Sequence, residues 1–164
     1  MIVYHGSTVE IRTPDLGRSK LFLDFGPAFY VTSFREQAER WARRKHSRAL
    51  SSVAPVVNVY ELDDDLSEFS VLRFGGVDEK WLDFVCDCRD GKDVHSGYDA
   101  IIGRVADDDV FRTIQSYRQG DITKARAVEL LRFARPNDQF ALRTERIISA
   151  KLRFVRSCRI ESEA

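Results

Sequence analysis

Apolar residues that alternate or gather in short runs predict a series of strands along the chain. Runs rich in Val, Ile, Phe and Tyr, bounded by Gly, Pro, Asp and Ser, are typical of strands. We expect strands over residues 1–5, 28–32, 53–62, 98–104, 139–143 and 150–155, with a short edge segment over 21–23.

Apolar residues spaced three or four positions apart predict the helices. These helices are expected over residues 34–47, 77–86, 107–120 and 121–134. Ser33 is expected to cap the first helix, because Glu36 stands three positions later and completes a capping box. Phe34, Ala38 and Trp41 then share one stripe of that helix.

The order of these elements predicts a mixed α+β fold. Two consecutive helices lie between strands, so the chain does not follow a regular alternation of strand and helix. We expect mostly antiparallel sheets with flanking helices in a single domain over residues 1–157, followed by a C-terminal tail over 158–164. A chain of 164 residues has the length of one domain and can bury enough surface to fold without a disulfide or a metal.

Composition narrows the class of protein. A hydrophobic content of 43% and a charged content of 32% are those of a soluble globular protein. The 26 basic and 26 acidic residues cancel, so net charge does not favour nucleic acid or an anionic membrane. No apolar stretch has membrane-spanning length, Met1 leads directly into a strand, and three cysteines make no disulfide framework. We therefore expect a cytoplasmic protein.

Basic residues are concentrated on the first helix despite the balanced net charge. The members of this group are Arg40, Arg43, Arg44, Lys45 and Arg48. Such a face is usually solvated, but it could instead contact the phosphates of a nucleotide or of a nucleic acid.

A candidate site begins near the N-terminus. A short strand ends in His5-Gly6-Ser7, a glycine turn leads into a strand with Tyr30, and a helix with Trp41 follows. Gly6 has no Cβ, so a ligand can approach its backbone N–H and C=O closely. His5 and Ser7 point to the opposite face and could bond ribose hydroxyls. This pattern favours a flat, amide-bearing ring, as in a nicotinamide dinucleotide, although no Gly-x-Gly-x-x-Gly motif follows any strand.

These residues resemble the catalytic domain of the diphtheria-toxin-like and poly(ADP-ribose)-polymerase-like ADP-ribosyltransferases. In those enzymes a His-Gly-Ser strand, a Gly-x-Gly-x-Tyr strand and a helix with a further aromatic residue form the NAD+ pocket. Residues 97–108, 120–123, 137–139 and 143–145 extend the resemblance to a bacterial family of uncharacterised ADP-ribosyltransferase-like proteins. Its members are often encoded beside small partner proteins, in the manner of toxin–antitoxin pairs.

The resemblance implies a role for each residue of the site. His5 would bind a ribose hydroxyl of the adenosine half, Ser7 would add a ribose contact, and Gly6 would pair with the nicotinamide carboxamide. Tyr30 and Trp41 would stack on the nicotinamide. The structural alternatives are a core or edge histidine, a turn serine, an ordinary strand-end glycine and a core-facing tryptophan.

The third signature position of the family falls on Gln139. Alternation places Gln139 on the face opposite the apolar side chains of its strand. An amide can bond a ribose hydroxyl but cannot act as a general base, so we expect transfer of single units rather than polymer synthesis. Glu145 is a substitute acid or an ordinary surface carboxylate. Ala28 and Ala38 replace a glycine and a serine of the family pattern.

The resemblance implies a mono-ADP-ribosyltransferase that takes NAD+ as substrate and modifies a protein or a nucleic acid. It also implies the toxin of a bacterial toxin–antitoxin pair, with a small antitoxin protein as partner. The run Cys86-Asp87-Cys88 with His95 has poor spacing for zinc, so no metal is expected. The alternatives are a non-catalytic nucleotide- or partner-binding module of the same fold, an NAD+ glycohydrolase and, more distantly, a relative of RNA 2′-phosphotransferases.

Overall fold

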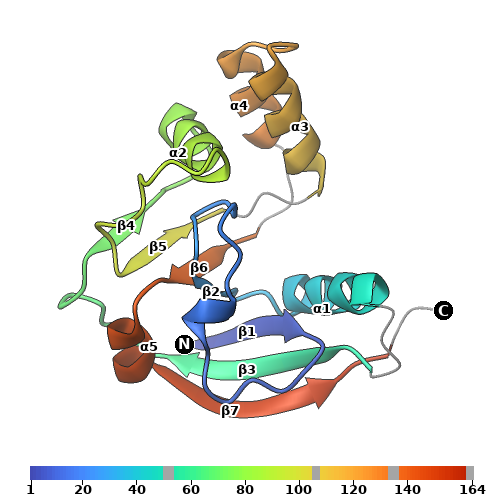
Figure 1. Ribbon diagram of the computed structural model, residues 1–164, viewed down its shortest axis with the longest axis vertical. Coiled ribbons are helices and arrows are strands. Elements are labelled where there is room, and N and C mark those ends of the chain that lie inside the picture. The colour runs from blue at the N-terminus through green and yellow to red at the C-terminus, as the bar shows by residue number, and fades with distance from the viewer. Residues whose placement is uncertain (50–53, 105–107, 133–136, 162–164) are drawn as a thin grey trace.

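The strands of this protein form two sheets (Figure 1), seen in a computed structural model that describes residues 1–49, 54–104, 108–132 and 137–161. The three-stranded sheet is antiparallel and has the order β1 (Ile2–Ser7), β3 (Val56–Leu62) and β7 (Leu152–Arg159). The four-stranded sheet has the order β2 (Phe29–Val31), β6 (Gln139–Leu142), β5 (Ala100–Gly103) and β4 (Val71–Arg73). Within it only the pairing of β4 with β5 is parallel. The expected α+β fold with mostly antiparallel sheets in one domain is confirmed.

The helices cover the two sheets separately. They are α1 (Arg35–Ala49), α2 (Glu79–Arg89), α3 (Asp108–Gln119), α4 (Lys124–Arg132) and α5 (Glu145–Lys151), with a 3-10 turn, η1, over Leu16–Arg18. Helix α1 lies along β1 and β3, whereas α2, α3 and α4 gather beside the four-stranded sheet (Figure 1). No described helix is long and apolar enough to cross a membrane.

Two large apolar clusters hold these layers together, and a smaller third one, made of Ala38, Ala42 and Val57, lies between α1 and the three-stranded sheet. One large cluster lies between the two sheets and includes Val3, Phe29 and Leu142. The other lies between the four-stranded sheet and the helices, where Trp81 and Ile101 are fully buried. Each large side chain buried in this way stabilises the fold by roughly 1.5–3 kcal/mol relative to an exposed one.

The two sheets meet where β1 passes the end of β2. Tyr4 and Thr32 exchange two backbone hydrogen bonds there, of 2.8 and 3.0 Å. This bridge joins β1 to the end of β2, and it brings His5 next to Tyr30.

The largest differences from the predicted elements lie near the end of the chain. Residues 150 and 151 were expected in a strand, but they end α5, a seven-residue helix whose Ile147 and Ile148 are buried. Its N-cap is Thr144, whose hydroxyl accepts a hydrogen bond from the N–H of Ile147. Strand β7 continues to Arg159, beyond the expected domain boundary at 157.

Two short segments also differ from expectation. Residues 21–23 form bends and turns rather than an edge strand. Strand β4, which was not expected, has three residues and gains its hydrogen bonds from β5. So short a segment carries too little periodicity to be recognised in the sequence.

Candidate functional site

Gly6 lies where α1 crosses β1. A Cβ built on Gly6 would lie 2.1 Å from the carbonyl oxygen of Ala38 and 2.7 Å from the backbone nitrogen of Ala42. Glycine is therefore required at this position for the helix to pack on the strand. The sequence interpretation assigned the missing Cβ to ligand approach, but the structure fills that space with the backbone of α1.

The backbone N–H and C=O of Gly6 point away from β3. Met1 and Leu62 exchange backbone hydrogen bonds of 2.7 and 2.8 Å at the start of the β1–β3 pair. Since every second residue of an antiparallel strand bonds its partner, His5 bonds β3 while Tyr4 and Gly6 face the opposite edge. Tyr4 uses this edge to pair with the end of β2, and within the described ranges no strand pairs with Gly6 there. This is the strand backbone that an amide-bearing ligand could use.

Lys45 reaches this edge from α1. Its ammonium donates a hydrogen bond of 2.7 Å to the carbonyl of Gly6 and lies 3.3 Å from Nε2 of His5. The pKa of Lys45 is lowered to about 8, first by burial of the ammonium and then by the like charge of Lys20. The sequence placed Lys45 on a basic helix face but gave no sign that it contacts Gly6.

His5 is held in its neutral form. Its ring stacks on Phe29 with centroids 4.5 Å apart, and Nδ1 lies 2.6 Å from the carbonyl oxygen of Tyr30. A carbonyl only accepts, so Nδ1 carries the proton and Nε2 is the acceptor. Burial and the adjacent Lys45 lower the pKa of His5 to about 3. His5 can therefore orient a hydroxyl donor through Nε2 near neutral pH.

Tyr30 fixes the turn that precedes it. Its hydroxyl donates to the carbonyl of Gly26 at 2.5 Å and accepts from the N–H of Phe25 at 3.2 Å. Burial raises the pKa of Tyr30 well above its usual value. Its ring packs against the cluster between the four-stranded sheet and α2–α4. The sequence predicted an open cleft around this ring, but much of it contacts the core.

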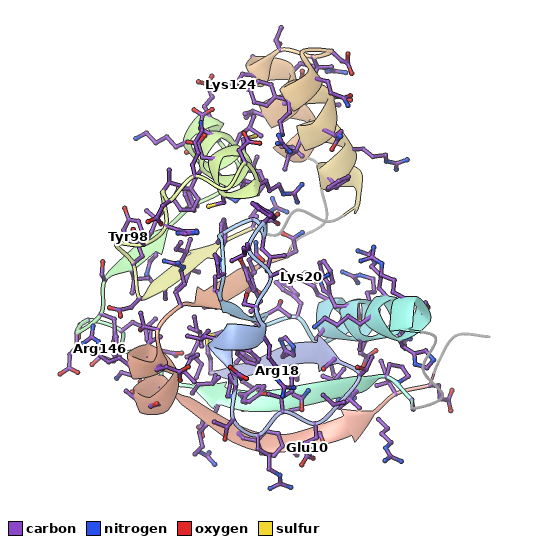
Figure 2. All side chains as sticks on the ribbon, in the orientation of Figure 1. Glu10, Arg18, Lys20, Tyr98, Lys124 and Arg146 are labelled. Carbon is purple, nitrogen blue, oxygen red and sulfur yellow. The ribbon has the colours of Figure 1, made fainter. Side chains whose placement is uncertain are left out.

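Further contacts hold the 19–28 loop, the segment between η1 and β2. The Ser19 hydroxyl bonds both the N–H and the C=O of Ala28, at 2.9 and 3.0 Å. Asp24 accepts from Nε of Arg89 at 2.8 Å, with both side chains largely buried. Lys20 lies on the side of this loop that faces α1 (Figure 2). These contacts hold the loop in place, and the loop carries the positive charge of Lys20 on the side toward Lys45.

Asp138 connects the start of β6 to the start of α1. Its carboxylate accepts hydrogen bonds from the hydroxyl of Thr32 at 2.7 Å and from the N–H and hydroxyl of Ser33. Its backbone carbonyl accepts from the side-chain amide of Gln37 at 2.7 Å. Ser33 was predicted to cap the helix, but its hydroxyl donates to Asp138 and the helix begins at Arg35. Sequence reasoning missed Asp138, because its partners lie more than 100 residues away.

Gln139 follows at once and lies on the same face of the four-stranded sheet as Tyr30. In the register of β2 and β6, Tyr30 is opposite Ala141, two residues after Gln139. Gln139 is buried, and its amide nitrogen is 3.4 Å from the carbonyl oxygen of Arg104. Glu145 is exposed in α5, beyond the other end of β6. This exposure fits its interpretation as a surface carboxylate.

Two other expected site residues have local partners. Trp41 is half-buried on α1, with the guanidinium of Arg44 5.1 Å from its ring centroid. Ser7 is buried, and its hydroxyl accepts from the N–H of Val9 at 3.3 Å, as a turn serine does. Neither contact tests the expected role toward a ligand.

The cysteines lie apart from this site. Cys86 and Cys88 are buried in α2, and burial raises the pKa of both thiols, that of Cys88 to about 12. In the part of the chain that the structure describes, no three His, Cys, Asp or Glu side chains gather in a way that could hold a metal. A shallow hollow between α2 and α4, lined by Asp78, Lys80 and Val128 among others, is also distant from β1.

Fold and site together define a two-sheet α+β protein in which no described strand pairs with the outer edge of β1 at Gly6, next to a neutral histidine. A family model described as "Protein of unknown function (DUF3990)" matches residues 1–154, and the chain belongs to this family. No protein with a curated description and no solved structure matched the chain.

Proposed function

We propose that this protein is an NAD+-dependent mono-ADP-ribosyltransferase with an ADP-ribosyltransferase-like fold. The observation that carries the proposal is the outer edge of β1 at Gly6, with which none of the described strands pairs, next to neutral His5. A primary carboxamide presents an N–H donor and a C=O acceptor side by side, so it complements the C=O and N–H of one strand residue. NAD+ carries such a carboxamide on the ring that leaves in ADP-ribosyl transfer.

Each residue then has a defined task in the reaction. Gly6 holds the carboxamide, Nε2 of His5 accepts from a ribose hydroxyl, and Trp41 provides an aromatic face. The bond between ribose C1′ and the nicotinamide nitrogen breaks, and its electron pair leaves with neutral nicotinamide. A nucleophile of the acceptor bonds to C1′ of the oxocarbenium-like ribose and loses its proton. Such positioning contributes roughly 7–11 kcal/mol in favourable systems, without a nucleophile from the enzyme.

Gln139 supports single transfer over polymer synthesis. Its amide can bond the nicotinamide ribose, but it offers no basic atom to activate a second ribose hydroxyl. The neighbouring carboxylate of Asp138 already accepts from Thr32 and Ser33. The acceptor therefore brings its own nucleophile, and one ADP-ribose unit is added at each site.

The chemistry of Gln139 and Asp138 favours a second candidate, a binding module that holds the nucleotide without turnover. Neither Gln139 nor the engaged Asp138 provides a general base. An NAD+ glycohydrolase, in which water attacks C1′, is the third candidate. All three use the same carboxamide site, and they differ in where the ADP-ribose goes.

We also propose that the protein acts in the cytoplasm as the toxin of a toxin–antitoxin pair, with a small antitoxin protein as its partner. This rests on the resemblance to families encoded beside such partners. A transferase that modifies a protein or a nucleic acid would damage the cell that makes it, so a neighbouring inhibitor is the expected companion.

One incubation separates the three candidates. The protein is mixed with bacterial extract and with NAD+ labelled in its adenosine half, and the label is followed by mass spectrometry. We expect single ADP-ribose units on protein or nucleic acid, about tenfold slower with Gln139→Ala, since one hydrogen bond to a developing charge is worth roughly 1.5–3 kcal/mol. The control is Lys80→Met, an exposed lysine of α2 outside the site.

Other outcomes assign the alternatives. Free ADP-ribose with released nicotinamide would indicate a glycohydrolase, and binding without turnover would indicate a binding module. Chains of linked units would contradict the role given to Gln139. No binding of NAD+ at millimolar concentration would overturn the proposal.

A further inference from the structure

Lys45 is hydrogen-bonded to the carbonyl oxygen of Gly6, which is the acceptor that a bound carboxamide needs. Its ammonium donates to the carbonyl of Gly6 at 2.7 Å, on the strand edge that β2 leaves unpaired. It also lies 3.3 Å from Nε2 of His5, the acceptor proposed for a ribose hydroxyl. One side chain therefore covers both groups, and it must leave before a dinucleotide can use them.

The same ammonium has no anionic partner within the described ranges. Neither Lys45 nor Lys20 forms an ion pair with a described carboxylate, although fourteen other pairs are formed elsewhere. Lys20 adds a second positive charge from the 19–28 loop and acts on Lys45 through space (Figure 2). Two neighbouring ammonium groups without a described carboxylate partner attract an anion such as a phosphate.

We propose that Lys45 is a specificity-determining residue that moves from the Gly6 carbonyl to the phosphates of an entering dinucleotide. This inference rests on the proposed function. It adds an explanation of how the site distinguishes a whole dinucleotide from a neutral carboxamide. A neutral ring that displaces Lys45 leaves the ammonium unpaired. A dinucleotide gives that ammonium a phosphate oxygen in exchange, with Lys20 as a second contact.

The lysine side chain suits such an exchange. Four rotatable bonds let its ammonium swing between two positions while the Cα stays fixed on α1. The apolar stem lies on the same side of α1 as Ala38 and Ala42, which pack on Gly6, so the movement needs no shift of the helix. In this exchange the ammonium gives up its hydrogen bond to the carbonyl of Gly6 and gains one to a phosphate oxygen.

Removal of the charge should therefore affect two ligands in opposite directions. Lys45→Met keeps most of the stem, opens the carbonyl of Gly6, and removes the phosphate contact. We expect benzamide to bind about tenfold more tightly and NAD+ about tenfold more weakly, because a hydrogen bond to a charged group changes affinity by this order. Lys20→Met should weaken NAD+ alone, and Lys80→Met should change neither.

Calorimetry of the full chain with NAD+ and with benzamide tests the exchange, with folding of each variant checked by circular dichroism. Lys45→Arg is the second variant, because it keeps the charge and should keep NAD+ affinity within a few fold. An unchanged ratio of the two affinities in Lys45→Met and Lys20→Met would overturn the exchange while leaving the carboxamide site intact. Failure of both ligands to bind any variant, wild type included, would instead overturn the proposed function and this inference with it.

Discussion

His5 is neutral because of where its two ring nitrogens lie. Nδ1 donates to the carbonyl of Tyr30 and Nε2 faces the ammonium of Lys45. Burial disfavours a second proton, which would also lie on Nε2 beside the positive charge of Lys45, so the pKa falls to about 3. The sequence could show that His5 lies in a strand, but not that Lys45 comes within reach from a helix 40 residues later.

This shift makes stability depend on pH in one direction. An unfolded chain takes up a proton at His5 near pH 6.5, whereas the folded protein does so only near pH 3, so acid stabilises the unfolded state. We expect the free energy of unfolding to fall by up to about 2 kcal/mol between pH 7 and pH 5 through this residue. His5→Gln, which does not titrate, should lose correspondingly less in urea denaturation at the two pH values. An equal loss in both proteins would contradict the neutral state assigned to His5.

Helix α1 and strand β1 pack so closely that only glycine fits between them. The atoms that a Cβ at Gly6 would meet are backbone atoms of Ala38 and Ala42, which cannot rotate away. Gly6→Ala must push the helix from the strand, at about 1–3 kcal/mol or more of stability. Gly76→Ala is the matched control, since no heavy atom lies within 4 Å of its Cβ position.

Thermal denaturation measures this difference. We expect the melting temperature of Gly6→Ala to fall by several degrees, at roughly 2–4 °C for each kcal/mol in a chain of this size, while Gly76→Ala stays near wild type. If both variants melt alike, the helix does not rest on the strand as described.

At the scale of elements, the sequence predicted what apolar periodicity determines, whereas the cap expected at Ser33 was wrong. Trp81, Leu82 and Val85 are buried in α2 as their spacing indicates, and Gly120 adopts the positive φ of a helix-ending residue. Helix α5 and strand β4 were missed because seven and three residues carry little pattern. The contacts of Asp138 and of Lys45 depend on which elements meet in space, and local sequence does not encode that.

The whole molecule brings the candidate site together from segments far apart in the chain. The region around His5 and Lys45 comes from the first third, and Gln139 from the last. We expect expression of the protein alone to slow bacterial growth, and His5→Ala to relieve this at equal protein level, because the variant loses both the ribose acceptor and a contact of Lys45. Lys80→Met should slow growth like wild type. Growth curves with matched immunoblots check this, and full toxicity of His5→Ala would favour an effect unrelated to the site.

The strand order determines when the two sheets can be completed during synthesis. Strand β6 stands between β2 and β5, and β7 completes the other sheet beside β3, yet both come after the strands that they pair with in the chain. A nascent chain that has released only its first hundred or so residues holds the edges of a sheet without its middle. Long-range pairing of this kind forms slowly, and it awaits the emergence of residues 139–142 from the ribosome. A chain that ends before residue 139 therefore carries His5 and Tyr30 without β6, the strand that pairs with β2, and the proposed site stays incomplete until β6 has emerged.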